Sequence, residues 1–256
     1  MQGVITRVFQ EAPGINGFYI KITNTADTAD AADENSEDAD AENSKPFSYV
    51  PGQYVMLAFD DDLDSKRAFS IVEYYPKTME ILVLIKKQGT FTQRMFDSKP
   101  GQELTISGPY GSFTLPKEQD DSQKNKSKPL VFIAGGIGIT PIYSMISEAL
   151  NNHDDAYNNI HLFYTAKSLE QMPLHEQLNE LENGKFRIKY HFTMQNSQGG
   201  MCKNKRLGCN DIVEEVPDFD KATYYICGPS AMIEGFRKEL LEKGIPEERI
   251  RSEDFS

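Results

Sequence analysis

The 256-residue sequence contains no tryptophan, few cysteines and no long apolar segment. Three cysteines, Cys202, Cys209 and Cys227, are an odd number without CxxC spacing, which excludes a disulfide framework and the usual zinc or iron-sulfur ligand sets. No segment approaches the ~18 apolar residues of a membrane span, and the first residues do not resemble a secretory signal. We therefore expect a cytoplasmic protein without a metal, in which any redox chemistry comes from a bound organic cofactor.

Basic residues are scarce relative to acidic ones. The chain has 27 Lys and Arg against 39 Asp and Glu, which gives a formal net charge of −12. Lys and Arg must neutralise a nucleic-acid backbone, so this balance argues against nucleic-acid binding. Eight of the acidic residues fall within residues 27–42, where alanine is the only apolar residue type. We predict a solvated, mobile loop there, with docking to a basic partner as the alternative.

The first half of the chain, residues 1–116, consists of short apolar segments separated by turn residues such as Pro51-Gly52 and Pro100-Gly101. This rhythm is typical of an antiparallel β-barrel or sandwich. The predicted strands are Val4–Phe9, Phe18–Ile22, Tyr54–Phe59, Arg67–Val72, Met79–Ile85 and Leu104–Ile106.

The second half, residues 129–256, alternates apolar strands with segments of helical spacing. The apolar run 130–134, for example, is followed by a glycine-rich turn and then by Ile142, Met145, Ile146 and Ala149. Alternating strands and helices predict a parallel sheet covered on both faces, the doubly wound α/β arrangement. Residues 117–128 form a polar run between the halves, and we predict that they are the linker between two domains.

Two glycine turns follow predicted strands of the second half. Gly135-Gly136-Ile137-Gly138-Ile139-Thr140-Pro141 lies directly between a strand and a helix. Glycines allow close approach of a diphosphate there, and the helix N-terminus supplies oriented N–H groups. Pro141 replaces the third glycine of the GxGxxG fingerprint, and its fixed φ suits a first helical turn. Cys227-Gly228-Pro229 ends another strand at the sheet edge where ligands collect, although each turn can also be a plain strand-to-helix connection.

Two segments of the first half can hold an anion or a planar ring. Arg67, Phe69 and Ile71 share one strand face, so a guanidinium that can clamp a diphosphate lies near an aromatic ring that can flank a planar group. Gly89-Thr90-Phe91-Thr92 opens a helical turn and is a second possible anion cradle. Taken alone, each segment is also consistent with an ordinary strand or turn.

Taken together and in this order, the segments resemble the ferredoxin-NADP reductase family along nearly the whole chain. The matching motifs are Pro51-Gly52-Gln53-Tyr54, Arg67-Ala68-Phe69-Ser70, Gly89-Thr90-Phe91-Thr92, Lys99-Pro100-Gly101, Gly108-Pro109, Gly135 to Pro141, Cys227-Gly228-Pro229 and Glu253-Asp254-Phe255. The resemblance implies an N-terminal six-stranded antiparallel barrel of Greek-key type that binds FAD. It also implies a C-terminal α/β domain that binds NAD(P)H, with the flavin between the two.

The resemblance implies roles for individual residues. Ser70, Cys227 and Glu253 would shape the contact across which NAD(P)H delivers hydride to flavin N5, and Phe255 would help to close this site. The implied FAD-binding residues are Arg67, Ala68, Phe69, Ser70, Val83, Leu84, Ile85, Thr90, Phe91 and Thr92. The implied NAD(P)H-binding residues are Gly136, Gly138, Thr140, Pro141, Gly228 and Pro229. Phe69 departs from the commoner tyrosine, which keeps a stacking ring but removes a hydroxyl, and Ser256 follows Phe255 where plant-type members end in a tyrosine.

The choice between NADH and NADPH stays open at this point. A 2′-phosphate requires basic side chains beyond the second and third strands of the α/β domain. Lys167 is the only basic residue directly there, whereas Lys203, Lys205 and Arg206 lie further along the chain. These three residues can bind the phosphate, or they can be a solvated cluster.

A flavin reductase of this kind would pass single electrons to a ferredoxin or a flavodoxin, which tend to be acidic. Candidates for a basic docking face are Lys66, Lys86, Lys87, Arg94 and Lys99. One alternative is an NAD(P)H-oxidising subunit of a larger complex of the hydrogenase or dihydroorotate dehydrogenase type. A second alternative is a nucleotide-sensing module without catalysis.

Overall fold

The computed structural model describes residues 1–23, 47–116, 128–151, 157, 159–193 and 206–255. The acidic segment 27–42, nearly all of the predicted linker, and Lys203 and Lys205 lie outside these residues, so the predictions made for them stay predictions. In the described part of the chain, no helix is long and apolar enough to cross a membrane.

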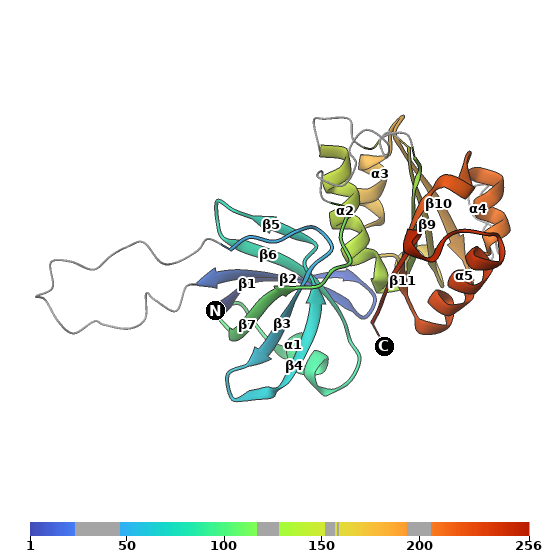
Figure 1. The fold of residues 1–256 in the computed structure, drawn as a ribbon. Coiled ribbons are helices and arrows are strands. Elements are labelled where there is room, and N and C mark those ends of the chain that lie inside the picture. Colours follow the sequence, from blue (N-terminus) through green and yellow to red (C-terminus); the bar gives the residue numbers. More distant parts are fainter. Residues whose placement is uncertain (24–46, 117–127, 152–156, 158, 194–205, 256) are drawn as a thin grey trace, which may run out of the picture.

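The first half forms an antiparallel sheet with the strand order β4-β3-β7-β1-β2-β6-β5 (Figure 1). Its strands are β1 (Gln2–Ala12), β2 (Ile15–Thr23), β3 (Tyr54–Phe59), β4 (Asp62–Ser70), β5 (Glu73–Tyr75), β6 (Glu80–Lys86) and β7 (Glu103–Tyr110), and helix α1 (Thr90–Asp97) lies between β6 and β7. The six longer strands correspond to the six predicted ones, and β5 is a three-residue addition at one edge. The antiparallel prediction is therefore confirmed.

Closure of this sheet follows from its strand order. The edge strands β4 and β5 are joined by only Ile71 and Val72, so the two edges must lie close together. The Val72 N–H donates to the Leu82 carbonyl of β6 at 2.9 Å. Apolar side chains of β1, β2, β3, β6 and β7 fill the interior of this barrel.

Strand β6 has a run of five buried residues, Ile81–Ile85, where a half-exposed strand would alternate. Val83 and Ile85 belong to the barrel core, whereas Leu82 and Leu84 belong to a second core shared with the α/β half. Both faces of β6 are thus covered. This explains why the sequence of this strand is apolar throughout.

The second half is a parallel sheet of order β10-β9-β8-β11-β12. Its elements are β8 (Leu130–Gly135), α2 (Ile139–Asn151), β9 (Ile160–Ala166), α3 (His175–Leu181), β10 (Phe186–Phe192), α4 (Cys209–Glu215), β11 (Thr223–Gly228), α5 (Ser230–Glu242) and β12 (Ile250–Asp254). Residues of α2 and α3 pack in one core and residues of α4 and α5 in another, so the helices cover opposite faces of the sheet. The doubly wound prediction is confirmed.

Polar and aromatic contacts hold the halves against each other. The Gly52 N–H donates to Ser144 Oγ of α2 at 2.9 Å in a buried position. The ring of Phe113 lies 5.6 Å from that of Tyr225 on β11, and the Tyr225 hydroxyl donates to the Thr114 carbonyl. The end of β12, close to the C-terminus, lies where the barrel meets the α/β half (Figure 1).

Candidate functional site

Among the described residues, buried polar atoms without a hydrogen-bond partner include Ser70 Oγ, at the end of β4, and Glu253 Oε2, near the end of β12; Gln2 Oε1 on β1 is another. Ser70 and Glu253 belong to opposite halves of the chain. Leaving such a group unpaired costs about 1–3 kcal/mol, and native proteins seldom keep it without a reason. This arrangement is typical of a site whose missing hydrogen bonds are made to a ligand.

Glu253 lies beside Cys227 in the parallel sheet, because the two residues are register partners on β12 and β11. Burial raises the pKa of the Glu253 carboxyl from its ordinary value of 4.5 to about 7. Burial, together with the charges of Glu253 and Asp254, raises the pKa of the Cys227 thiol well above its ordinary value. Cys227 is fully buried and its thiol stays protonated, so it contributes packing to the site and not a thiolate nucleophile.

Ser70, Tyr54 and Tyr110 form a row across three barrel strands. Tyr54 on β3 pairs with Ser70 of β4 on one side and with Tyr110 of β7 on the other. Directly paired residues point to the same face of a sheet, and the two tyrosine rings lie 6.0 Å apart. Ser70 is buried, while Tyr110 is 46% exposed, so the row runs from the interior to the surface.

The predicted FAD-binding residues of β4 differ in how far they are exposed. Phe69 is half-buried, and its ring stacks on Phe91 of α1 with centroids 5.9 Å apart. Arg67 and Ala68 are exposed. The Arg67 guanidinium donates to the neighbouring main-chain carbonyls of Lys66, at 2.9 Å, and Ser65, at 3.3 Å. Both contacts are local and exposed to solvent, so the guanidinium can break them and bind an anion instead.

Helix α1 begins directly after Gly89, whose φ of 89° lies in the left-handed region that glycine adopts readily. The first main-chain bond of the helix runs from Gln93 N–H to the Gly89 carbonyl, so the N–H groups of Thr90, Phe91 and Thr92 come before the intrahelical ladder. The Thr92 hydroxyl accepts from the Gln88 N–H at 2.6 Å and donates to Gly89 O at 3.2 Å. Its side chain therefore stabilises the turn, and its main-chain N–H is the group available to an anion.

The two glycine turns predicted in the second half pack against each other. A Cβ atom at Gly138 would lie 2.3 Å from the Cys227 carbonyl oxygen and 2.8 Å from Gly228 N, so only glycine fits there. Gly136, with φ of 54°, has open space where a side chain would be. Thr140 and Pro141 are buried in the first turn of α2, and the Thr140 hydroxyl donates to the Ile137 carbonyl at 3.0 Å.

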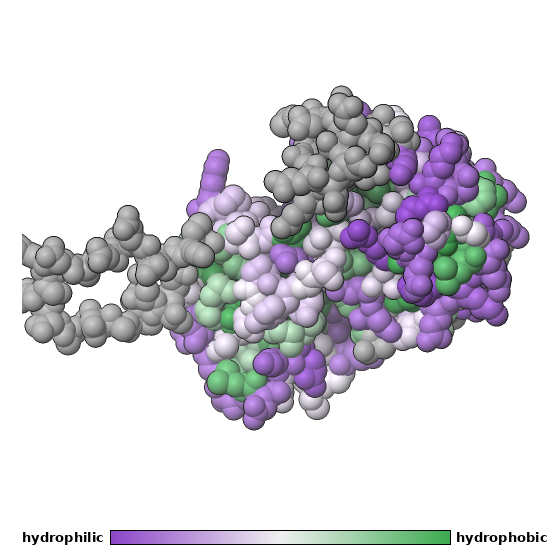
Figure 2. Space-filling view, viewed as in Figure 1, coloured by the Kyte–Doolittle hydropathy of each residue, from purple (hydrophilic) through white to green (hydrophobic). Residues whose placement is uncertain are grey.

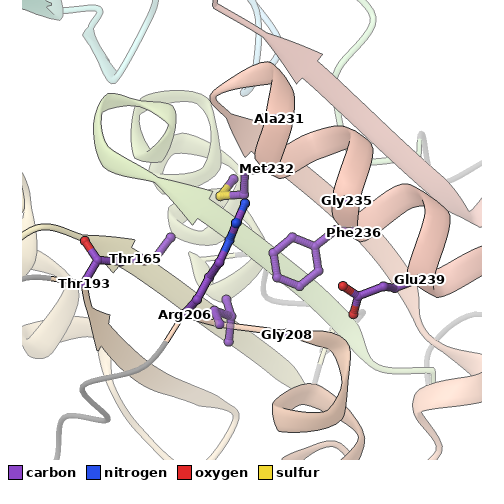
Figure 3. A pocket seen from close by; sticks show the side chains of 10 residues that line it. Thr165, Thr193, Arg206, Gly208, Ala231, Met232, Gly235, Phe236 and Glu239 are labelled. Carbon is purple, nitrogen blue, oxygen red and sulfur yellow. The ribbon is translucent and has the colours of Figure 1, made fainter.

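A cavity of about 570 Å³ opens at the carboxyl ends of β9 and β10, next to α5 (Figure 3). Arg206 and Glu239 are the charged residues among those that line it. The Glu239 carboxylate accepts the Cys209 N–H at 3.0 Å, and Figure 3 shows the ring of Phe236 between Arg206 and Glu239. The remaining lining residues are Thr165, Thr193, Leu207, Gly208, Ala231, Met232 and Gly235.

Sequence reasoning identified Arg206 and the strand ends of this cavity but missed its α5 wall. Met232, Gly235, Phe236 and Glu239 recur at the spacing of one helical face. That spacing is visible in the sequence and indicates a shared face. It does not show whether the face points into the core or into a cavity.

Two family models match the chain, one in each half. The oxidoreductase FAD-binding domain matches residues 40–115, and the oxidoreductase NAD-binding domain matches residues 132–238. The chain belongs to the ferredoxin-NADP reductase family. This family consists of FAD-dependent NAD(P)H oxidoreductases, so FAD is the cofactor and a nicotinamide dinucleotide the co-substrate that its domains are built to bind.

Curated relatives resemble the chain along most of its length. "Propane 2-monooxygenase, reductase component" of Rhodococcus jostii (strain RHA1) is 27% identical over 221 residues, which cover 82% of this chain and 56% of the relative. The chain thus spans about half the length of the curated relatives it matches.

Solved structures share the fold. A flavohemoglobin from Malassezia yamatoensis with bound FAD and heme has a TM-score of 0.77 at 22% identity, covering 100% of this chain and 60% of that one. A ferredoxin NADP+ reductase from Neisseria gonorrhoeae with bound FAD and NADP has a TM-score of 0.75 at 17% identity, covering 99% and 98%. At these identities the likeness is one of fold.

Proposed function

We propose that the chain binds FAD between its two halves and passes electrons from NAD(P)H to a one-electron carrier. The observation that carries this proposal is the pair of unpartnered buried atoms, Ser70 Oγ and Glu253 Oε2, contributed by opposite halves. A ligand with hydrogen-bonding atoms at the boundary between the barrel and the sheet would satisfy both. A flavin ring has such atoms on its edge, and its planar face suits the half-buried ring of Phe69.

The FAD diphosphate would bind beside Arg67 and the N-terminus of α1. An exposed guanidinium supplies a paired donor, and the first N–H groups of the helix supply further donors at Thr90, Phe91 and Thr92. The main chain of Val83, Leu84 and Ile85, together with Ala68, would complete the flavin contacts. The left-handed φ of Gly89 supports this assignment, because it turns the chain directly into the helix.

NAD(P)H would bind along the carboxyl edge of the parallel sheet. Its diphosphate would lie on the Gly136–Gly138 turn and the first turn of α2, with Thr140 and Pro141 fixing the backbone. Its adenosine end would enter the cavity between Arg206 and Glu239, where Phe236 offers a ring for stacking. Gly228 and Pro229 would border the nicotinamide end.

Bound FAD would supply the redox chemistry, since a flavin accepts a hydride and can release its electrons singly. Ser70 and Glu253 would orient the two reacting rings by hydrogen bonding. With its pKa of about 7, Glu253 can hold a proton below neutral pH and lose it above. Cys227 and Phe255 would shape the nicotinamide side of the site through packing.

The acceptor would be a ferredoxin, a flavodoxin or a comparable carrier. The name of the Rhodococcus relative, a reductase component of a monooxygenase, supports electron delivery to a separate protein. Lys66, Lys86, Lys87 and Lys99 are exposed and offer positive charge to an acidic carrier, whereas Arg94 is already paired with Asp61 at 2.6 Å.

A second candidate function is that of a reductase subunit in a larger assembly. It is favoured by the name of the Rhodococcus relative, which is one component of a monooxygenase. Such a subunit requires an apolar patch on the barrel. In Figure 2, green patches on the visible face of the barrel are separated by white and purple side chains, so this view shows no continuous apolar patch.

Anaerobic titration of the purified protein with NADH and then with NADPH tests the proposal. The protein should be yellow, and either nucleotide that is a substrate should bleach the flavin absorption band. Electron transfer to a ferredoxin or flavodoxin added afterwards should restore the color. A yellow protein that neither nucleotide bleaches would refute the proposed activity.

A further inference from the structure

Tyr164, on β9, is a fully buried side chain whose hydroxyl reaches two main-chain carbonyls. Its oxygen lies 3.1 Å from Gly136 O in the glycine turn and 3.1 Å from Pro173 O in the segment before α3. A phenol has one proton to donate, so the two carbonyls share it. Burial raises the pKa of Tyr164 well above its ordinary value, which keeps this proton in place across the physiological pH range.

The segment that shares this proton is itself tied to the barrel. Leu174 follows Pro173 directly, and its N–H donates to Glu11 Oε1 of β1 at 2.7 Å. The φ of Leu174 is 63°, an uncommon value for a residue other than glycine, so this contact holds the backbone in a conformation that it would not adopt readily alone. Glu11 is 163 residues away in the sequence and lies in the other half of the molecule.

Gly136 is a residue of the glycine turn that has open space on the side where a Cβ would lie. Its φ is 54°, and no atom lies within 4 Å of the position that a Cβ would occupy. The Tyr164 hydroxyl holds the Gly136 carbonyl by a hydrogen bond. The Gly136 carbonyl and the N–H of the next residue, Ile137, belong to one planar peptide unit. Holding the carbonyl therefore also fixes the direction of this N–H.

We propose that Tyr164 and Glu11 are positioning residues that fix the glycine turn relative to the barrel. The connection runs from Glu11 through the Pro173-Leu174 peptide and the Tyr164 hydroxyl to the Gly136 carbonyl. It sets both the orientation of the diphosphate-binding N–H groups and their distance from the flavin domain. This inference rests on the proposed function, in which NAD(P)H binds to that turn.

The test compares steady-state kinetics of Tyr164→Phe with those of Tyr224→Phe. Tyr224 is a fully buried tyrosine on β11, and its hydroxyl donates to the Phe219 carbonyl at 2.7 Å instead of to the glycine turn. Removing one hydrogen bond from the turn should raise the KM for NADH and for NADPH by about 3- to 10-fold. Flavin content should stay equal to that of the wild type, and Tyr224→Phe should leave KM within about 2-fold.

Glu11 gives an independent test at the other end of the connection. Glu11→Ala removes the acceptor of the Leu174 N–H and should raise KM, whereas Glu11→Gln keeps a carbonyl oxygen and should restore a KM near that of the wild type. The double variant Tyr164→Phe, Glu11→Ala should show less than the product of the two single effects, because both break one connection.

Several outcomes would overturn the inference. If Tyr164→Phe loses thermal stability but keeps the wild-type KM, Tyr164 has only a structural role. The inference also fails if the KM effects of Tyr164→Phe and Glu11→Ala multiply independently in the double variant. Should Tyr164→Phe not fold, equal KM values for Glu11→Ala and the wild type would still refute the connection. Failure of the proposed function looks different, since the wild-type protein itself would then not be bleached by either nucleotide.

Discussion

Replacing Glu253 with glutamine should stabilise the protein at alkaline pH and leave its stability unchanged in acid. The pKa of this carboxyl is about 7 in the folded protein, against an ordinary value of 4.5. Between these two values the folded state binds more protons than the unfolded state, so stability falls as pH rises through this range. Above pH 7 the folded protein carries the full cost of a poorly solvated carboxylate, which glutamine does not have.

The size of the effect follows from the difference between the two pKa values. The difference between 7 and 4.5 corresponds to roughly 3 kcal/mol for a group fully shielded from water. Glu253 is only partly shielded, and solvent screening reduces the expected gain to about 1–2 kcal/mol. In a domain of this size that is a rise of roughly 2–8 °C in Tm.

Thermal unfolding of the wild type and of Glu253→Gln at pH 5 and pH 8, each with and without added FAD, measures this. The gain should be present at pH 8 and much smaller at pH 5. The rate of flavin reduction by the nucleotide should also lose a titration near pH 7 in the variant. A stability difference that is the same at both pH values would refute the reasoning, because it would mean that the carboxyl does not titrate between them.

Five further substitutions separate the binding site from its scaffold. Ser70→Ala should slow flavin reduction but change stability by less than about 0.5 kcal/mol, because the Ser70 hydroxyl has no partner. Ser144→Ala should instead lower stability by about 1–3 kcal/mol, because it leaves the buried Gly52 N–H unpaired. Gly138→Ala should lower stability by about 1–3 kcal/mol and raise KM for the nucleotide, since the new methyl group collides with the main chain of β11. In the control Gly184→Ala the methyl group enters open space, so stability and KM should stay nearly unchanged. Glu239→Gln removes the negative charge from the cavity and should raise kcat/KM for NADPH relative to NADH by about 3- to 10-fold, on the order of 1 kcal/mol at a surface site. An unchanged NADPH to NADH ratio would show that the 2′ position does not lie near Glu239.

Features that depend on local backbone chemistry were predictable from the sequence. The run Gly135–Pro141 needs glycine to pack against a neighbouring strand, and the close approach of Gly138 to the Cys227 carbonyl is the physical reason for glycine at that position. Likewise, Gly89 with its left-handed φ starts α1 where the sequence places a helical turn. Both features depend on a few neighbouring residues, so a single sequence is enough to predict them.

Features that depend on distant contacts were not predictable. The apolar run of β6 indicates a strand, but only the covering α/β half explains why Leu82 and Leu84 are apolar. Phe236 has the spacing of a core residue, yet it also lines the cavity. The bond between Glu11 and Leu174 joins residues that no local pattern connects. Thr92 was predicted to bind FAD, but the local bonds of its hydroxyl to Gln88 and Gly89 depend on a turn geometry that sequence spacing does not specify.

The most direct test is to measure the FAD content of the purified protein by its absorption spectrum, in the wild type and in Ser70→Ala, and to follow anaerobic bleaching by NADH and NADPH. The account predicts close to one FAD per chain in both proteins, rapid bleaching of the wild type and slow bleaching of the variant. A wild-type protein that holds no flavin and takes up none from solution would contradict it.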